Sequence, residues 1–518
     1  MHATLYRNAN SASARERLSA DRNANRYSIA IIVAFVAITL WLGSALGVWT
    51  DELYTLHSTS RGPLKALESA LVFEQQPPFY FVILSFWRMV SNSDFFARCF
   101  SIGCAAFTLI VLHRFIRRHV VALGPSVFVC LVALNPFFIW TALEIRTYAL
   151  LIAEAAVIAT SFYNGFLHDR IDRPARAVFV IVSILGVYTQ YYFGFLVVGC
   201  ACAVLVVRRE RLKSIVLALV PFAIASLPAA KIALWQAHQI DHTSVHELSN
   251  VKALLATIET FILPRDWIDR GYQVGSLPRI AYTTFVVGSV AFLIPVLWRG
   301  RWSRLALGFG VISIVVGLLF FLLILMRVEM YFPRHITVLF IPLVLAVSTC
   351  IAGRMDRAYV RNVVAGYVLL SLVSAVFAYR PLAKNGDWKR VGDYLTVETH
   401  RGDVIDIFDA EMVLGVRHYY RGGALLRPIP VEPVFDRWDI GPYKLLSPAA
   451  AGRAIERAYP SGGRRWLVIS PYPCPQYETV EGCRNLLQYV SSNYDIALER
   501  RFYLTDVLLL RPKMNGKR

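Results

Sequence analysis

The sequence predicts an α-helical protein that crosses a membrane many times and carries a small α/β domain at its C-terminal end. Of its 518 residues, 56% are hydrophobic and the mean hydropathy is +0.49, which is more than one soluble core requires. Apolar runs approaching the length that spans a bilayer recur along most of the chain. Beyond residue 380, charged residues become frequent, and short apolar strands alternate with helical stretches, which is typical of a small α/β domain.

The apolar runs predict about eleven membrane spans. They cover residues 28–48, 95–115, 120–141, 146–164, 177–190, 192–207, 214–235, 279–298, 305–326, 335–353 and 359–380. The run from Ala177 to Val207 also fits one tilted helix, but basic residues at both of its ends favour two short spans that turn near Gln190. The segment from Pro77 to Val90, about 14 residues, is too short to cross and is expected to lie at the outer interface as a helix.

Basic residues predict the orientation of these spans. The net charge of +19 would also suit a nucleic-acid partner, but the cations lie in short clusters between apolar runs, the pattern of cytoplasmic loops. We therefore expect a cytoplasmic tail over residues 1–27, a membrane domain over 28–380 with outer loops 49–94 and 236–278, and an extracytoplasmic domain over 381–518. The clusters lie near Arg114, Arg118, Arg170, Arg173, Arg208, Arg211, Arg301, Arg304, Arg357 and Arg361.

This topology gathers acidic, aromatic and basic side chains at the outer face. Asp51 and Glu52 directly follow the first span, where an acid is destabilising unless it is solvated, paired or used. Arg pairs bidentately with phosphate, and carboxylates serve as bases or metal ligands, so such a face suits an anionic lipid head group. The other residues gathered there are Gln76, Glu144, Arg146, Tyr191, Tyr192, Arg327 and Arg334.

The order of motifs along residues 28–380 resembles the GT-C membrane glycosyltransferases. The similarity is greatest to bacterial members related to protein O-mannosyltransferases and to the aminoarabinose transferase of lipid A. The motifs are Asp51-Glu52, Gln76-Pro77-Pro78-Phe79-Tyr80, Ala97-Arg98, Asn135-Pro136-Phe137, Glu144-Ile145-Arg146-Thr147-Tyr148 and Tyr188-Thr189-Gln190-Tyr191-Tyr192.

The resemblance implies an enzyme of the bacterial inner membrane that moves a monosaccharide from a polyprenyl-phosphate carrier to a protein, lipid or envelope glycan on the outer face. It implies that Asp51, with Glu52 beside it, and Glu144 are the catalytic carboxylates. Asp51 and Glu144 would then act as base or as ligands of a divalent cation such as Mg²⁺ or Mn²⁺. Substrate-binding roles fall to Gln76, Arg146, Tyr191, Tyr192, Arg327 and Arg334. Many members have His where this chain has Gln76 and Gln190, so a substrate preference does not transfer.

Simpler interpretations compete with these assignments. Asp51 and Glu52 could merely cap a helix, Glu144 and Arg146 could be a structural ion pair, and the two tyrosines could belong to the aromatic belt of the membrane. A secondary transporter or lipid flippase is the competing class, but its polar groups belong near the bilayer midplane. No glycine-rich phosphate loop is present in the sequence, so no nucleotide cofactor is expected.

Two of the eight cysteines, Cys474 and Cys483, lie outside the predicted spans. An oxidising compartment permits disulfides. We therefore expect these two residues to be bonded to each other in the C-terminal domain.

Overall fold

The computed structural model describes residues 2–120, 124–239, 257, 260–261, 303–326, 333–352, 358–379, 382–436, 445, 447–456, 463–470 and 479–513. The chain forms two compact units. Unit 1 comprises Met1–Gly43, Arg98–Ala230 and Ala253–Ala378, and unit 2 comprises Ser44–Ala97, Lys231–Lys252 and Tyr379–Arg518. The first segment after α1 therefore belongs to the same unit as the C-terminal domain.

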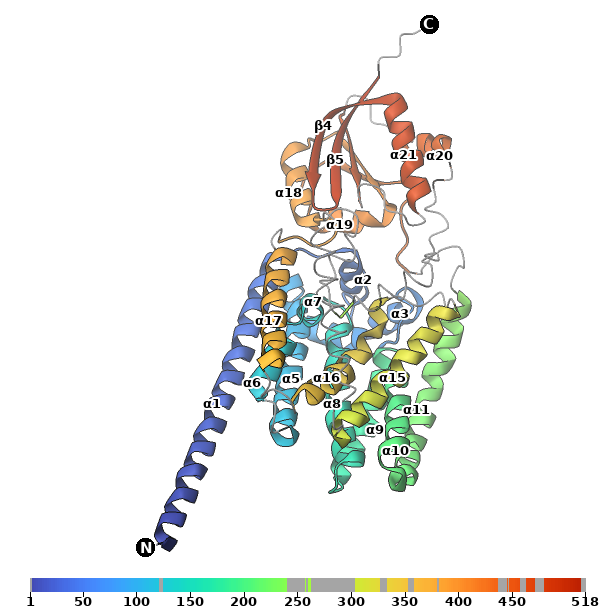
Figure 1. Cartoon of the computed structure of the whole chain (residues 1–518). Helices are drawn as coiled ribbons and strands as arrows, with labels where there is room; N and C mark the ends of the chain where they lie inside the picture. The colour runs from blue at the N-terminus through green and yellow to red at the C-terminus, as the bar shows by residue number, and fades with distance from the viewer. Residues whose placement is uncertain are drawn as a thin grey trace. The chain divides into compact units, whose positions relative to one another are not determined.

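Unit 1 is a bundle of apolar helices (Figure 1). Six stretches among the described residues are long and apolar enough to cross a membrane, and α6 with α7 would make a seventh. The predicted multi-spanning membrane protein is thereby confirmed, while the span predicted over residues 279–298 lies outside the described residues. The helices are α1 (His2–Ala45), α5 (Asp94–His119), α6 (Pro125–Ala133), α7 (Pro136–Leu143), α8 (Tyr148–Phe162), η1 (Tyr163–Leu167), α9 (Arg173–Thr189), α10 (Phe193–Val207), η2 (Arg209–Arg211), α11 (Leu212–Gln239), α15 (Arg304–Leu325), η4 (Pro333–Leu339), α16 (Phe340–Ala352) and α17 (Ala358–Tyr379).

The span predicted over residues 120–141 is bent. Helices α6 and α7 meet there at 63°. Pro136 is the first residue of α7, where its missing N–H is tolerated, and the Asn135 side chain accepts a hydrogen bond from the Phe138 N–H at 3.1 Å. The Asn-Pro pair thus starts a new helix inside the apolar run.

The apolar run from Ala177 to Val207 forms two helices, as predicted. Helix α9 ends at Thr189 and α10 begins at Phe193. A Cβ atom on Gly186 would lie 2.4 Å from the Phe193 ring, so only glycine allows the two helices to approach this closely. The tight turn between them carries Gln190, Tyr191 and Tyr192.

Unit 2 begins with three short helices, α2 (Thr50–Ser58), α3 (Pro63–Val72) and α4 (Phe79–Arg88). Helix α4 occupies the apolar segment predicted to be too short to cross, and it has 10 residues. Arg88 donates hydrogen bonds back to the Leu56 carbonyl at 2.5 Å and to the Thr59 hydroxyl at 2.6 Å. These bonds hold α4 against the end of α2.

The C-terminal part of unit 2 is the predicted α/β domain. Its mixed sheet has the order β2-β1-β3-β5-β4, with β1 parallel to β2 and β3, and β5 antiparallel to β3 and β4. Figure 1 shows α18 on one side of this sheet and α20 and α21 on the other. Strands predicted from the sequence over residues 404–408, 466–470 and 507–510 correspond to β1, β3 and β5, and helical stretches predicted over 388–398 and 448–459 correspond to α18 and α20. The sequence did not single out β2, β4, α19 or α21. The elements are α18 (Trp388–Glu398), β1 (Val404–Phe408), η5 (Ala410–Met412), α19 (Val413–Tyr419), β2 (Leu425–Pro428), α20 (Pro448–Glu456), β3 (Arg465–Ile469), α21 (Thr479–Asn493), β4 (Tyr494–Phe502) and β5 (Thr505–Pro512).

Cys483 lies in α21 and is disulfide-bonded. Its predicted partner, Cys474, lies outside the described residues. The specific pairing therefore stays a prediction.

Candidate functional site

Asp51 and Glu52, the paired carboxylates, lie in the first turn of α2 but have different surroundings. Glu52 is fully buried, and one of its oxygens accepts a hydrogen bond from the Trp49 N–H at 3.2 Å, which caps the helix. Its other oxygen accepts one from Lys384 Nζ at 2.6 Å, and the Lys384 side chain is only 9% exposed. Glu52 is thus part of a buried ion pair, whereas Asp51 is half-buried, with its Oδ2 atom inside the protein.

Glu411 and Asp409, two carboxylates that the sequence did not single out, lie near Asp51. Both follow β1, and Glu411 accepts a hydrogen bond from the buried Tyr54 hydroxyl on α2. Burial raises the pKa of Glu411 to about 7; the Tyr54 hydrogen bond opposes this rise, while the charges of Asp409 and Asp51 add to it. Burial likewise raises the pKa of Asp409 to about 6. The pair of Glu411 and Asp409 can therefore exchange a proton near neutral pH.

An aromatic cluster borders these carboxylates within unit 2. The Phe73 ring meets the Tyr54 ring edge-on at 5.4 Å and the Phe435 ring at 5.9 Å, and the His57 ring lies 5.6 Å from Phe435. Burial, together with the charge of Arg61, lowers the pKa of His57, so this imidazole is neutral at pH 7. The cluster offers apolar and ring-stacking surface beside the acids.

The C-terminal domain holds both ends of the segment that carries Asp51. The Val48 N–H donates to the Tyr419 hydroxyl at 3.0 Å, and the Thr50 hydroxyl contacts the Met412 sulfur at 3.2 Å. At the other end, His418 Nε2 lies 2.8 Å from a carboxylate oxygen of Asp94. These contacts come from η5 and α19, so the domain positions α2.

Gln76, a predicted substrate-binding residue, also lies in unit 2. It is half-buried, and its N–H donates to the Ala70 carbonyl at 2.9 Å. Nearby, the Ser58 hydroxyl on α2 donates to Glu74 at 3.1 Å. The structure thus ties the Gln-Pro-Pro segment to the helix that carries Asp51.

Glu144 and Arg146 belong to unit 1. Glu144 ends α7, Arg146 lies in the short break before α8, and both are buried. The Ser101 hydroxyl donates to the Glu144 carbonyl at 2.5 Å, and the rings of Trp140 and Tyr148 pack across the break at 4.9 Å. The segment is therefore fixed by packing on both sides.

Tyr191, Tyr192 and Arg334, also in unit 1, are half-buried. The Tyr192 ring lies 5.3 Å from the ring of His335, the residue after Arg334, and 5.5 Å from Phe320. The structure therefore brings the α9–α10 turn together with the start of η4. Arg327 lies outside the described residues.

Glu154, an acid that the sequence analysis missed, is buried in α8. One of its oxygens accepts a hydrogen bond from the Thr189 hydroxyl at the end of α9, at 2.9 Å. A carboxyl inside an apolar stretch could have been recognised from the sequence, since such residues are rare and usually functional. The signal for Asp409 and Glu411 was their place after a buried strand, because the carboxyl ends of parallel strands commonly form binding sites.

The sequence predicts a divalent cation. Among the described residues, no group of three or more His, Cys, Asp or Glu side chains is placed to bind a metal ion. Asp51 belongs to unit 2 and Glu144 to unit 1. Their joint role as metal ligands therefore stays a prediction.

Solved structures share the fold of this chain. No protein-family model and no curated protein matches the sequence. The structure of ArnT from Cupriavidus metallidurans in the apo state is 13% identical, with a TM-score of 0.54, and the match covers 93% of this chain and 98% of ArnT. The structure of the same protein bound to undecaprenyl phosphate is 12% identical, with a TM-score of 0.55, over 95% and 99% of the two chains. The predicted GT-C fold is confirmed. At this identity, the likeness establishes the fold alone.

Proposed function

We propose that this protein is an integral-membrane glycosyltransferase that moves a monosaccharide from a polyprenyl-phosphate carrier to an acceptor on the outer face of a bacterial inner membrane. The shared fold with ArnT bound to undecaprenyl phosphate supports the donor class. The basic clusters between spans support a cytoplasmic N-terminus and a C-terminal domain outside.

The observation that carries the proposal is the different environment of the two carboxylates on α2. Glu52 is buried in its pair with Lys384, so it supports the local structure. Asp51 is half-buried, and the start of its helix is hydrogen-bonded to the C-terminal domain through Val48 and Thr50. A positioned carboxylate of this kind is suited to general-base catalysis.

In the proposed reaction, Asp51 takes the proton of an acceptor hydroxyl while the hydroxyl oxygen attacks the anomeric carbon of the sugar. The bond between that carbon and the carrier phosphate oxygen breaks, and the carrier leaves as its phosphate. Glu411, whose pKa is about 7, can receive the proton from Asp51 and pass it to solvent. No step requires a nucleotide, because the donor is already activated.

Binding of the carrier phosphate is proposed for Arg334, whose neighbour in sequence, His335, packs on Tyr192, and for Arg327 as the second predicted arginine. A planar guanidinium pairs with two phosphate oxygens, which a lysine does not reproduce. Arg334→Lys and Arg327→Lys should therefore weaken donor binding. Unchanged donor affinity in both variants would reject this assignment.

The function can be tested with the protein purified from its own membranes. Mass spectrometry of the co-purified lipid should identify a polyprenyl-phosphate sugar, and the reconstituted protein should release polyprenyl phosphate when an extract containing acceptor is added. A lipid-free preparation that releases none from added donor would contradict the proposal. Coupled uptake of a solute into vesicles would favour the transporter class instead.

A further inference from the structure

Four apolar stretches of unit 1 have ends that meet in one basic cluster. One stretch ends at Leu167 and another at His119, while two others begin at Arg209 and Arg304. The rings of His119 and His168 lie 5.4 Å apart, and Arg304 pairs with Asp169 at 2.7 Å. Because membrane spans end where the hydrocarbon ends, this cluster lies at a membrane interface.

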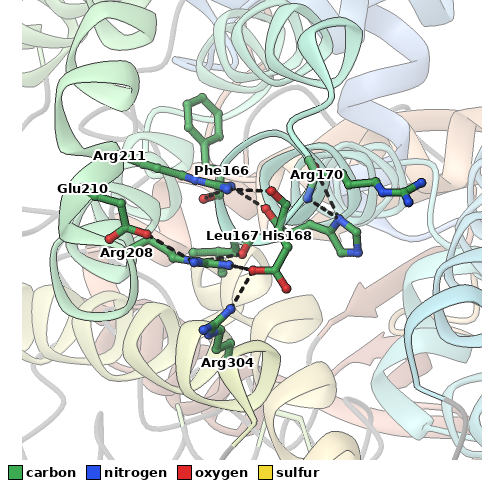
Figure 2. Close-up of polar contacts among 9 residues, drawn as sticks. Phe166, Leu167, His168, Arg170, Arg208, Glu210, Arg211 and Arg304 are labelled. Carbon is green, nitrogen blue, oxygen red and sulfur yellow. Dashed lines mark hydrogen bonds and ion pairs between the residues drawn. The ribbon is translucent and has the colours of Figure 1, made fainter.

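Within the cluster, arginine side chains form hydrogen bonds with the short segment from Phe166 to Arg170 (Figure 2). Arg211 donates to the carbonyls of Phe166 at 3.1 Å and of Asp169 at 2.9 Å, and also to the His168 carbonyl. Arg208 donates to the Leu167 carbonyl at 3.2 Å and pairs with Asp169. These arginines are therefore engaged in holding the segment.

Three further arginines, Arg118, Arg170 and Arg173, surround a cavity of about 470 Å³ next to this segment. All three are exposed, and their guanidinium groups have no ion-pair partner in the part of the chain that the structure describes. In Figure 2 the Arg170 side chain extends away from the ion pairs of Arg208 and Arg304. The carboxylate in the lining, Asp172, accepts a hydrogen bond from the Ala175 N–H at 3.1 Å. The cavity therefore has an excess of positive charge.

We propose that this cavity binds the phosphate group of an anionic phospholipid in the leaflet on this side of the membrane. Guanidinium groups form charge-assisted hydrogen bonds with phosphate oxygens. Ile171 also lines the cavity and is 52% exposed, so an apolar side chain is available to the glycerol and upper acyl carbons. Basic pockets at the ends of membrane helices bind such head groups, and each cation near the surface strengthens the attraction.

The test uses the full-length protein and a triple variant, Arg118→Gln, Arg170→Gln and Arg173→Gln. The matched control, Arg114→Gln, Arg209→Gln and Lys213→Gln, removes the same charge from exposed cations that do not line the cavity. Native mass spectrometry counts bound phosphatidylglycerol, with phosphatidylcholine as the neutral comparison. We expect the cavity variant to bind phosphatidylglycerol about 10- to 100-fold more weakly, and the control to bind it as the wild type does.

Three outcomes would overturn the proposal. The cavity variant could bind phosphatidylglycerol as tightly as the control, or the wild type could bind both lipids equally. Inorganic phosphate could also displace the lipid at equal concentration, which would assign the site to free phosphate. Should the triple variant fail to fold, the single variant Arg170→Gln takes its place, because it changes only one exposed side chain. Its affinity for phosphatidylglycerol should be at least about threefold lower than that of the wild type. Because none of these readouts uses sugar transfer, they do not depend on the proposed function.

Discussion

Two acidic sites of this protein differ in what surrounds the carboxylate. Near α2 in unit 2, burial raises the pKa of Glu411 to about 7. In the basic cluster of unit 1, Asp169 is exposed, and its hydrogen bond with Arg208, together with the charges of Arg208 and Arg304, lowers its pKa. Burial raises the pKa of a carboxyl toward neutral pH, where it exchanges protons. Pairing with arginine lowers the pKa, so the carboxylate keeps its negative charge. The first environment suits proton transfer, and the second suits a structural contact.

The largest effect is expected at Asp51. Asp51→Asn should lower the rate of sugar transfer by about 10²- to 10⁴-fold, because a positioned base is removed. The measurement is the release of polyprenyl phosphate from the co-purified donor, with donor binding and melting temperature as checks on folding. Asp169→Asn is the matched control and should transfer sugar normally. If Asp51→Asn stays active while Glu144→Gln is inactive, the base has been assigned to the wrong carboxylate.

Glu52 should matter for stability more than for chemistry. Glu52→Gln leaves Lys384 charged and buried, and breaking a buried pair in this way costs about 3–5 kcal/mol. The melting temperature should fall clearly, and adding Lys384→Met should restore part of it, since both charges are then gone. A Glu52→Gln protein that melts like the wild type but does not transfer sugar would make Glu52 the catalytic carboxylate.

The raised pKa of Glu411 predicts that the protein becomes less stable as the pH rises. Its pKa is about 7 in the folded protein against an ordinary value of 4.5, so the folded state holds this proton more tightly than the unfolded state. The stabilising contribution of this proton to the free energy of unfolding is therefore fully present below pH 4.5 and is lost as the pH rises toward 7. Melting curves of Glu411→Gln should lose this decline relative to the wild type. The exposed Glu432→Gln variant should keep it, and parallel curves for all three proteins would contradict the raised pKa of Glu411.

The smallest effect is expected in the basic cluster. Asp169 is exposed, so its ion pairs with Arg208 and Arg304 are screened by water and salt. Asp169→Asn should change the melting temperature by no more than about 2 °C, and the difference should shrink as salt is added. A large fall in melting temperature that does not change with salt would show that the ion pairs of Asp169 stabilise the fold as strongly as a buried contact does.

The sequence by itself determined the class of this protein and much of its order. Apolar runs must be satisfied by helices in a membrane, so α5, α8 and α15 could be placed from composition and length. The adjacent acids at Asp51 and Glu52 were visible because acids are destabilising at the end of an apolar span. The buried strand Val404–Phe408 was visible as a short apolar run.

Only the tertiary structure decided which carboxylate does what. Asp51 and Glu52 are equivalent in the sequence, and it is the contact of Lys384 with Glu52, across more than 300 residues, that distinguishes them. Glu411 is brought to the site only by folding, which places the Tyr54 hydroxyl where it donates to the Glu411 carboxylate. Patterns in a sequence report the period and polarity of local structure, whereas the pKa and the partner of a carboxyl depend on groups that come close only when the chain folds.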